Sequence, residues 1–151
     1  MKRPIFAFFL YLSSVAMSFA ADKTECKAIA MQMINIMGAQ YVRTSGIFEN
    51  IFLYLPGLDD LTVMCGPGKP SISISKDGEI TPYVLAMGSI AANIISGQKD
   101  RDALKKIALC IKRARMDGFE SANISTRYVN IDSQSFLRDG GGTNFEISKT
   151  D

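Results

Sequence analysis

The sequence predicts an α+β domain in which one antiparallel sheet of about four strands is packed by three helices, in the order α-β-β-β-α-α-β. Apolar residues recur with a helical period in three segments. Between the first two of these segments, three short stretches with alternating apolar residues are separated by brief turns, which favours antiparallel pairing. The apolar side of such a sheet is buried by the apolar sides of the helices.

The first twenty residues have the pattern of a secretory signal peptide. Two basic residues near the start precede an apolar run over residues 4–17, and Ser18 and Ala20 fit the minus-three and minus-one positions of a cleavage site. The run is too short for a permanent membrane span. We therefore expect residues 1–20 to be removed, and we expect a protein without a membrane span that a bacterial cell exports to its periplasm or secretes.

The chain after the signal peptide has the length of one domain. We divide it into a single α+β domain over residues 21–132 and a polar, glycine-rich C-terminal tail over residues 133–151. The whole chain holds 17 basic and 15 acidic residues, and Lys2 and Arg3 account for the excess. The exported chain is then neutral, so no electrostatic attraction for nucleic acid is expected.

The first helix is predicted from Thr24 to about Thr44. Apolar residues recur there close to the period of 3.6 residues, and Thr24 is a suitable N-cap. The dipeptide Ser45-Gly46 is expected to end the segment.

Three strands are predicted next, over Asn50–Leu55, Leu61–Cys65 and Ser71–Lys76. In the first strand, Phe52 and Tyr54 alternate with aliphatic residues that face the core, so both rings are expected on the solvent side of the sheet. In the third strand, serine alternates with isoleucine, which predicts that one face of the sheet is wet.

Two helices follow the strands. Thr81 is expected to cap a helix over residues 82–96, which begins with proline, ends at Gly97 and is apolar on nearly all sides. Asp100 is expected to cap the third helix, which runs to about Met116.

The last part of the chain has weaker signals. Residues 123–131 are rich in β-branched and aromatic side chains, which favours a fourth strand. From residue 133 onward the composition is polar and includes three consecutive glycines, which predicts a loose backbone. Phe145 and Ile147 are compatible with an added edge strand.

Three cysteines remain after export, and an oxidising compartment favours one disulfide with one cysteine left over. Cys65 and Cys110 both fall on the core-facing side of their predicted elements, which favours a bridge between them. Cys26, at the start of the first helix, is then free or is an alternative partner. The loop-closure entropies of the possible bridges are too similar to decide.

The sequence contains no histidine, which removes Ser–His and Cys–His nucleophile pairs and most zinc and haem ligation. We expect no cofactor and no metal.

Ser73 and Lys76 have the S-x-x-K spacing of certain serine enzymes, but residues three apart on a strand point to opposite faces. The carboxylate pair Asp59 and Asp60 lies in turn-forming sequence. An enzyme that uses these groups is the weakest of three hypotheses.

The leading hypothesis is a non-catalytic domain that binds another macromolecule, with a protein as the expected partner. One candidate contact surface is the solvent side of the sheet. The other is a basic face of the third helix that comprises Lys105, Lys112, Arg113 and Arg115. The alternative hypothesis is a carrier that holds a small molecule or a lipid between the sheet and the apolar helix over residues 82–96.

Overall fold

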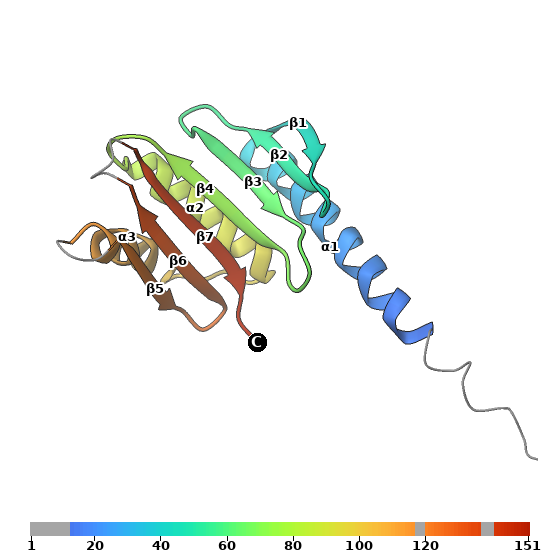
Figure 1. Ribbon diagram of the computed structural model, residues 1–151. Helices are drawn as coiled ribbons and strands as arrows, with labels where there is room; N and C mark the ends of the chain where they lie inside the picture. The colour runs from blue at the N-terminus through green and yellow to red at the C-terminus, as the bar shows by residue number, and fades with distance from the viewer. Residues whose placement is uncertain (1–12, 117–119, 137–140) are drawn as a thin grey trace, which may run out of the picture.

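The computed structural model describes residues 13–116, 120–136 and 141–151, with side chains from residue 23 onward. Within this part of the chain, three helices pack on one face of a seven-stranded antiparallel sheet (Figure 1). The helices are α1 (Ser13–Met37), α2 (Pro82–Ser96) and α3 (Ala103–Ala114). The strands are β1 (Gln40–Ser45), β2 (Asn50–Tyr54), β3 (Asp60–Met64), β4 (Ser71–Lys76), β5 (Ser121–Ser125), β6 (Val129–Ser135) and β7 (Thr143–Lys149). The α+β class is confirmed, but the sheet is larger than predicted.

Two meanders meet in the middle of the sheet. The strand order is β1-β2-β3-β4-β7-β6-β5, so the last strand of the chain lies between β4 and β6. β7 pairs with β6 over its whole length and with β4 from Thr143 to Ser148. The prediction of a C-terminal tail over residues 133–151 is therefore wrong, because this segment supplies the end of β6 and a central strand.

The burial of β7 explains why its composition was misleading. Phe145 and Ile147 point to the helices and are fully buried, whereas Asn144, Glu146 and Ser148 point to the open face of the sheet. A strand with one wet face needs apolar residues at only every second position. The polar residues at the other positions of β7 give this segment the composition of a C-terminal tail.

The first predicted helix is wrong at both ends. α1 begins at Ser13, so Thr24 lies within the helix and is not its N-cap. α1 stops at Met37, and Gly38 adopts a φ of 73°, the left-handed conformation that commonly ends a helix. The segment from Tyr41 to Thr44 belongs to β1 instead. Its aromatic and β-branched residues favour an extended backbone, and this local preference prevails over an approximate helical period.

The second helix agrees closely with its prediction. The Thr81 hydroxyl accepts the Val84 N–H at 3.4 Å, and Gly97 closes α2 with a φ of 66°.

α3 begins later than predicted, because Asp100 does not cap it. The buried Asp100 carboxylate accepts the Asp102 N–H at 3.0 Å and the Thr126 hydroxyl, so it holds the loop before α3 against the β5–β6 turn.

The single strand predicted over residues 123–131 is in fact a hairpin. β5 ends at Ser125, and β6 begins at Val129. Between them, the Thr126 hydroxyl accepts the N–H groups of Tyr128 and Val129, at 3.1 and 3.0 Å. A local side-chain turn of this kind interrupts a run with uniformly high strand propensity.

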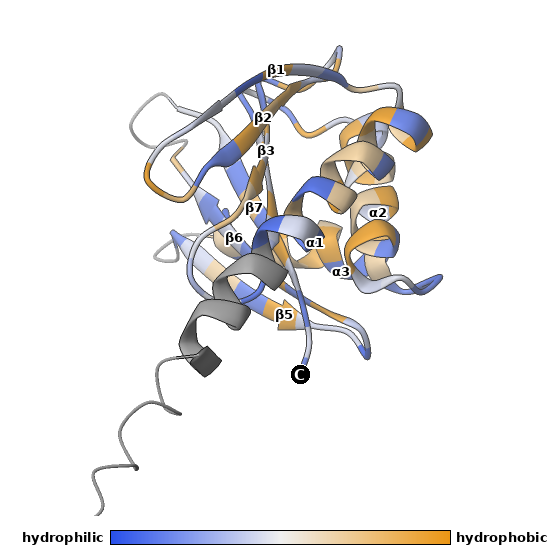
Figure 2. Ribbon diagram, turned by 90° about the vertical axis from the view of Figure 1, so that its right-hand side faces the viewer, coloured by the Kyte–Doolittle hydropathy of each residue, from blue (hydrophilic) through white to orange (hydrophobic). Residues whose placement is uncertain are grey.

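Each helix covers two neighbouring strands. α1 lies against β2 and β3, α2 against β4 and β7, and α3 against β6 and β5. Strands are about 4.8 Å apart in a sheet, and packed helices are about 8–10 Å apart. Three helices therefore cover six strands, and β1, the seventh, extends beyond the helical layer at one edge of the sheet (Figure 2).

The disulfide joins α1 to the end of β3. It links Cys26 to Cys65, with a Cα–Cα distance of 5.8 Å, and Cys110 is free and buried. The favoured Cys65–Cys110 pairing is therefore wrong, although both side chains face the core as predicted. Cys110 lies over β5 and β6, where its thiol donates to the carbonyls of Ala122 and Ile131 at 3.3 and 3.4 Å. Two central strands separate β6 from β3, which places Cys110 away from Cys65.

Replacement of Phe145 by alanine tests the central position of β7. We expect Phe145→Ala to lower the free energy of unfolding by about 3–5 kcal/mol, because it opens a cavity between α2 and the sheet. The matched change Ser148→Ala, on the open face of the same strand, should stay within about 0.5 kcal/mol of the parent. Urea unfolding of the purified protein measures both values, and equal effects would contradict the assignment.

Candidate interaction surface

α3 presents a solvent-exposed face in which large apolar residues alternate with cations. Its opposite side packs on β5 and β6 through Ala103, Ile107, Cys110, Ile111 and Ala114. We call the exposed side, together with the residue that follows the helix, the α3 face; it comprises Leu104, Lys105, Leu109, Lys112, Arg113 and Met116.

The apolar members of the α3 face are unusually accessible for their size. Leu104 is 44% exposed, Leu109 36% and Met116 54%. Single exposed apolar side chains are ordinary, but several on one face can mark a contact surface. Leu109 and Met116 share a stripe with two of the cations, because positions separated by three, four or seven residues stack on one side of a helix.

The cations of the α3 face lack ion-pair partners among the described residues. Lys105, Lys112 and Arg113 take part in none of the ion pairs there. Lys112 and Arg113 lie in the last turn of α3, where the helix dipole stabilises positive charge. The dipole disfavours Lys105, which lies in the first turn. The extension of positive charge along the whole helix therefore has no explanation within the helix itself.

Two open grooves lie beside Met116. One has a volume of about 450 Å³ and is formed with Ile80, Leu85 and Ile111, next to Lys112. The other has a volume of about 410 Å³ and is formed with Arg113 and the β5 residues Ser121, Ala122 and Asn123. Both grooves are lined by apolar side chains together with cations, and protein interfaces likewise combine an apolar core with a polar rim.

Arg115 does not belong to the free basic face. Its guanidinium donates to the Thr143 hydroxyl from Nε at 3.1 Å and from Nη2 at 2.8 Å, and Nη2 also donates to the Gly78 carbonyl at 3.0 Å. Arg115 thus ties the end of α3 to β7 and to the loop that precedes α2. Of the four predicted basic residues, the structure leaves Lys105, Lys112 and Arg113 exposed on the α3 face.

The open face of the sheet, the other predicted contact surface, is largely satisfied internally. Over β4, β7, β6 and β5 its outward side chains are serine, asparagine, glutamine, aspartate and glutamate. The hydroxyls of Ser73 and Ser75 donate to Asn144 Oδ1 at 2.9 and 3.2 Å, and the Asn123 amide donates to Asp132 at 2.6 Å. A protein partner would have to desolvate these groups at a cost that apolar contacts do not offset.

At the β2 end of the open face, one of the two aromatic rings is already in contact with a side chain of β1. Phe52 and Tyr54 point to the solvent side, as predicted. However, the Arg43 guanidinium lies 4.0 Å from the centroid of the Phe52 ring, and it donates to the Ser45 hydroxyl at 2.7 Å. The α3 face is therefore the better candidate, since within the described part of the chain its cations form no ion pair.

The structure lends no support to a ligand between the sheet and α2. A Cβ atom added at Gly88 would lie 2.9 Å from a ring carbon of Phe145 and 3.1 Å from the Cδ1 atom of Ile107. At this point α2 is in direct contact with β7 and α3, because only glycine permits so close an approach.

The carboxylates and the S-x-x-K pair take structural positions. Asp59 accepts the Asp77 N–H at 2.6 Å and the Lys76 ammonium at 2.9 Å, and these contacts hold the pKa of Asp59 below its ordinary value. Ser73 points to the open face, where it donates to Asn144, and so it does not meet Lys76. In the described part of the chain, no group of three or more acidic or cysteine side chains is arranged to hold a metal ion.

Comparison of the chain with models of known protein families, with curated proteins and with solved structures found no match. Among the helices of the described segments, none has both the length and the apolar character that are needed to cross a bilayer.

Sequence reasoning missed the apolar members of the α3 face. Leu104 and Leu109 fall outside the core stripe of the helix, and this signal was available in the sequence. Only the structure could show that Met116 borders two grooves, because one of them requires residues from β5 and the other requires residues from the start of α2.

The cysteine arrangement gives a direct chemical test. Burial raises the pKa of the Cys110 thiol to about 11, so at pH 8 it is protonated and enclosed. We expect the native protein to resist alkylation by iodoacetamide at pH 8, and to take up one equivalent after unfolding without reductant. Peptide mapping of the unreduced protein should find Cys26 joined to Cys65. Reduction of the Cys26–Cys65 disulfide should lower the free energy of unfolding by about 4 kcal/mol, because the unfolded chain then no longer contains a closed loop. A bridge that involves Cys110 would contradict the structure.

The two roles of the basic residues are separable by mutation. Arg115→Ala should lower the free energy of unfolding by about 2 kcal/mol, because the buried Thr143 hydroxyl loses its charged donor. Lys112→Ala, one turn earlier on the exposed side, should change it by no more than about 0.5 kcal/mol. If thermal and urea unfolding showed the two variants to be equally stable, the tie through Arg115 would have to be abandoned.

Proposed function

We propose that this protein is an exported, non-catalytic domain that binds another protein, and that the α3 face receives an acidic segment of that partner. The observation on which the proposal depends is the composition of this face. Three large apolar side chains are exposed between three cations that form no ion pair within the described structure.

The covalent structure is compatible with export. The Cys26–Cys65 disulfide suits an oxidising compartment, and disulfides are rare in the cytosol. The signal-peptide pattern at the start of the chain leads to the same location. We therefore place the binding partner in the periplasm or outside the cell.

The two kinds of side chain on the α3 face have different effects on binding. Leu104, Leu109 and Met116 bury apolar area and slow dissociation, since interface affinity depends mainly on a few desolvated anchors. Lys105, Lys112 and Arg113 attract carboxylates and disfavour basic partners, so they act mainly on association rate and specificity. A partner segment with acidic residues beside apolar ones satisfies both requirements.

Charge reversal on the α3 face tests the proposal. The triple variant Lys105→Glu, Lys112→Glu and Arg113→Glu leaves Arg115 in place, so the fold keeps its tie to Thr143. We expect the tagged wild-type protein to capture a specific partner from a periplasmic or secreted extract of the organism that exports it. The triple variant should bind that partner at least ~10-fold more weakly.

A control with the same change of charge separates a local effect from a general one. Lys99, Arg127 and Lys149 are exposed and lie outside the α3 face, and their replacement by glutamate should leave binding within about threefold of wild type. Capture that persists in the first triple variant, or that is lost equally in both, would rule out the α3 face as the contact.

A further inference from the structure

The helical layer is incomplete over β1. On this strand, Tyr41 pairs with Leu53 and Thr44 pairs with Ile51, so Tyr41 and Thr44 point to the same side of the sheet as the core. Each of the three helices covers two other strands. Above the inner side of β1, beside α1, none of the described helices is packed.

Several apolar side chains of β1 and of the β1–β2 turn are exposed. Tyr41 is 59% exposed, and Ile47 in the β1–β2 turn is 93% exposed. Val42 and Phe48 are exposed as well. The strand at the opposite edge is different, because α3 covers β5 and buries Ile124. Exposure of this apolar cluster is therefore a property of the β1 edge and not of sheet edges in general.

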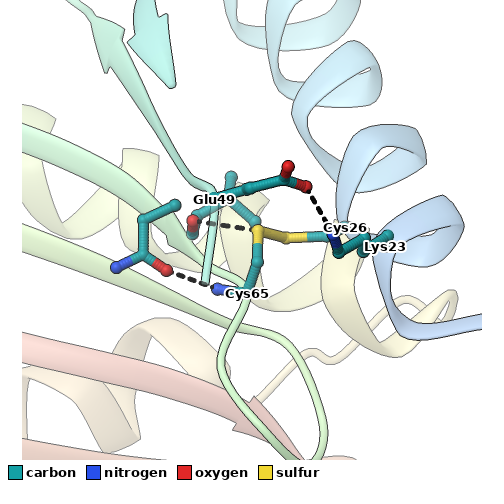
Figure 3. Close-up of a disulfide and its surroundings, with 6 residues drawn as sticks. Lys23, Cys26, Glu49 and Cys65 are labelled. Carbon is teal, nitrogen blue, oxygen red and sulfur yellow. Dashed lines mark hydrogen bonds and ion pairs between the residues drawn. A yellow bond between two sulfur atoms is a disulfide. The ribbon is translucent and has the colours of Figure 1, made fainter. Parts of the chain in front are cut away.

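A pocket of about 180 Å³ marks the angle between α1 and β1. We call this region the α1–β1 corner; it comprises Lys23, Lys27, Tyr41, Thr44, Phe48 and Ile51. The Cys26–Cys65 disulfide lies at its base, and the Lys23 ammonium reaches across it to Glu49 at 3.0 Å (Figure 3). The disulfide fixes α1 to β3, so the corner has a defined shape.

The charge of the corner is positive. Glu49 is already paired with Lys23, which holds the pKa of Glu49 below its ordinary value. Lys27 lines the same pocket and has no ion-pair partner among the described residues. An occupant with carboxylates is therefore favoured over a neutral or a basic one.

The edge of β1 is poorly suited to pairing with another strand. The register of β1 against β2 shifts between Tyr41 and Arg43, which is a β-bulge in the middle of a six-residue strand. Bulges and charged side chains are the devices by which sheet edges avoid added strands. An added strand would also leave the inner side of Tyr41 uncovered.

We propose that the α1–β1 corner binds an amphipathic helix of a partner protein, which lies beside α1, covers the inner side of β1 and directs carboxylates toward Lys27. Such a helix completes the layer at the spacing that α1, α2 and α3 already have. Its apolar stripe packs on Tyr41 and Phe48. The site is independent of the α3 face, which lies over β5 and β6 at the other edge of the sheet.

Three designed peptides test this proposal. The first is an 18-residue amphipathic helix with leucines on one side and glutamates beside them. The second has lysine in place of each glutamate, and the third alternates leucine and glutamate to favour a strand. Each has one tryptophan, and because the protein has none, tryptophan fluorescence anisotropy reports on the peptide alone. The protein is the full exported chain with Lys105→Glu, Lys112→Glu and Arg113→Glu, so that binding at the α3 face does not contribute.

We expect the acidic helical peptide to bind more tightly than either of the others. In this background, Tyr41→Ser should weaken its binding at least ~10-fold. Lys27→Glu should weaken it and strengthen binding of the lysine peptide, whereas Lys149→Glu should do neither. Circular dichroism of each variant confirms that the fold is retained.

Several outcomes would overturn the proposal. Equal binding of the three peptides, or no binding of the acidic helix, would remove the helix-binding site. A preference for the alternating peptide would assign the edge to strand addition. Binding that is insensitive to Tyr41 and Lys27 would place the contact elsewhere. Self-association of the protein that masks Tyr41 would show that a second copy covers the corner.

Discussion

The pairing of β4 with β7 joins the two halves of this molecule into one sheet. β4 ends the first meander and β7 ends the chain, so their contact closes the longest loop of the fold. The pairing places Phe145 and Ile147 directly under α2, where Gly88 lets the helix approach the Phe145 ring. Without it, the strands β1–β4 and the strands β7-β6-β5 would form two separate sheets, and α2, which packs on both β4 and β7, would lose its common support.

The difference in spacing between helices and strands determines which surfaces remain open. Because one helix covers two strands, three helices cannot cover seven. The inner side of β5 is covered by α3, whereas the inner side of β1 is not covered by any of the described helices. The two proposed contact regions follow from this arrangement: α3 presents its outer side at one edge of the sheet, and the α1–β1 corner lies at the other.

Positive charge is a feature that these two regions share. The α3 face has three exposed cations, and Lys23 and Lys27 lie at the α1–β1 corner, although other exposed cations such as Lys99 and Arg127 lie elsewhere. On the open face of the sheet, serine hydroxyls donate to the amide oxygen of Asn144, and the Asn123 amide donates to the Asp132 carboxylate on the neighbouring strand. The partners proposed above, with carboxylates, would meet complementary charge at either end of the helical layer, whereas the polar groups of the sheet are already bonded to one another.

The sequence by itself determined the α+β class, the two caps of α2, the outward direction of Phe52 and Tyr54, and the core-facing side of Cys65 and Cys110. These properties depend on residues that are close together in the chain, through the periods of 2 and 3.6 and the conformational preferences of threonine, proline and glycine. The exposed basic residues Lys105, Lys112 and Arg113 were available in the same way, because helical periodicity shows which side of α3 is apolar.

Only the tertiary structure decided which strands are neighbours, and several features depend on that. Cys26 meets Cys65 because α1 crosses β3, and Arg115 meets Thr143 because α3 ends beside β7. β7 is a central strand because its alternating apolar residues match those of β6, the preceding strand, and also those of β4, which lies far away in the chain. Periodicity indicates which face a side chain takes, but the position of a strand in a sheet is fixed by contacts between distant segments, and no single segment contains that information.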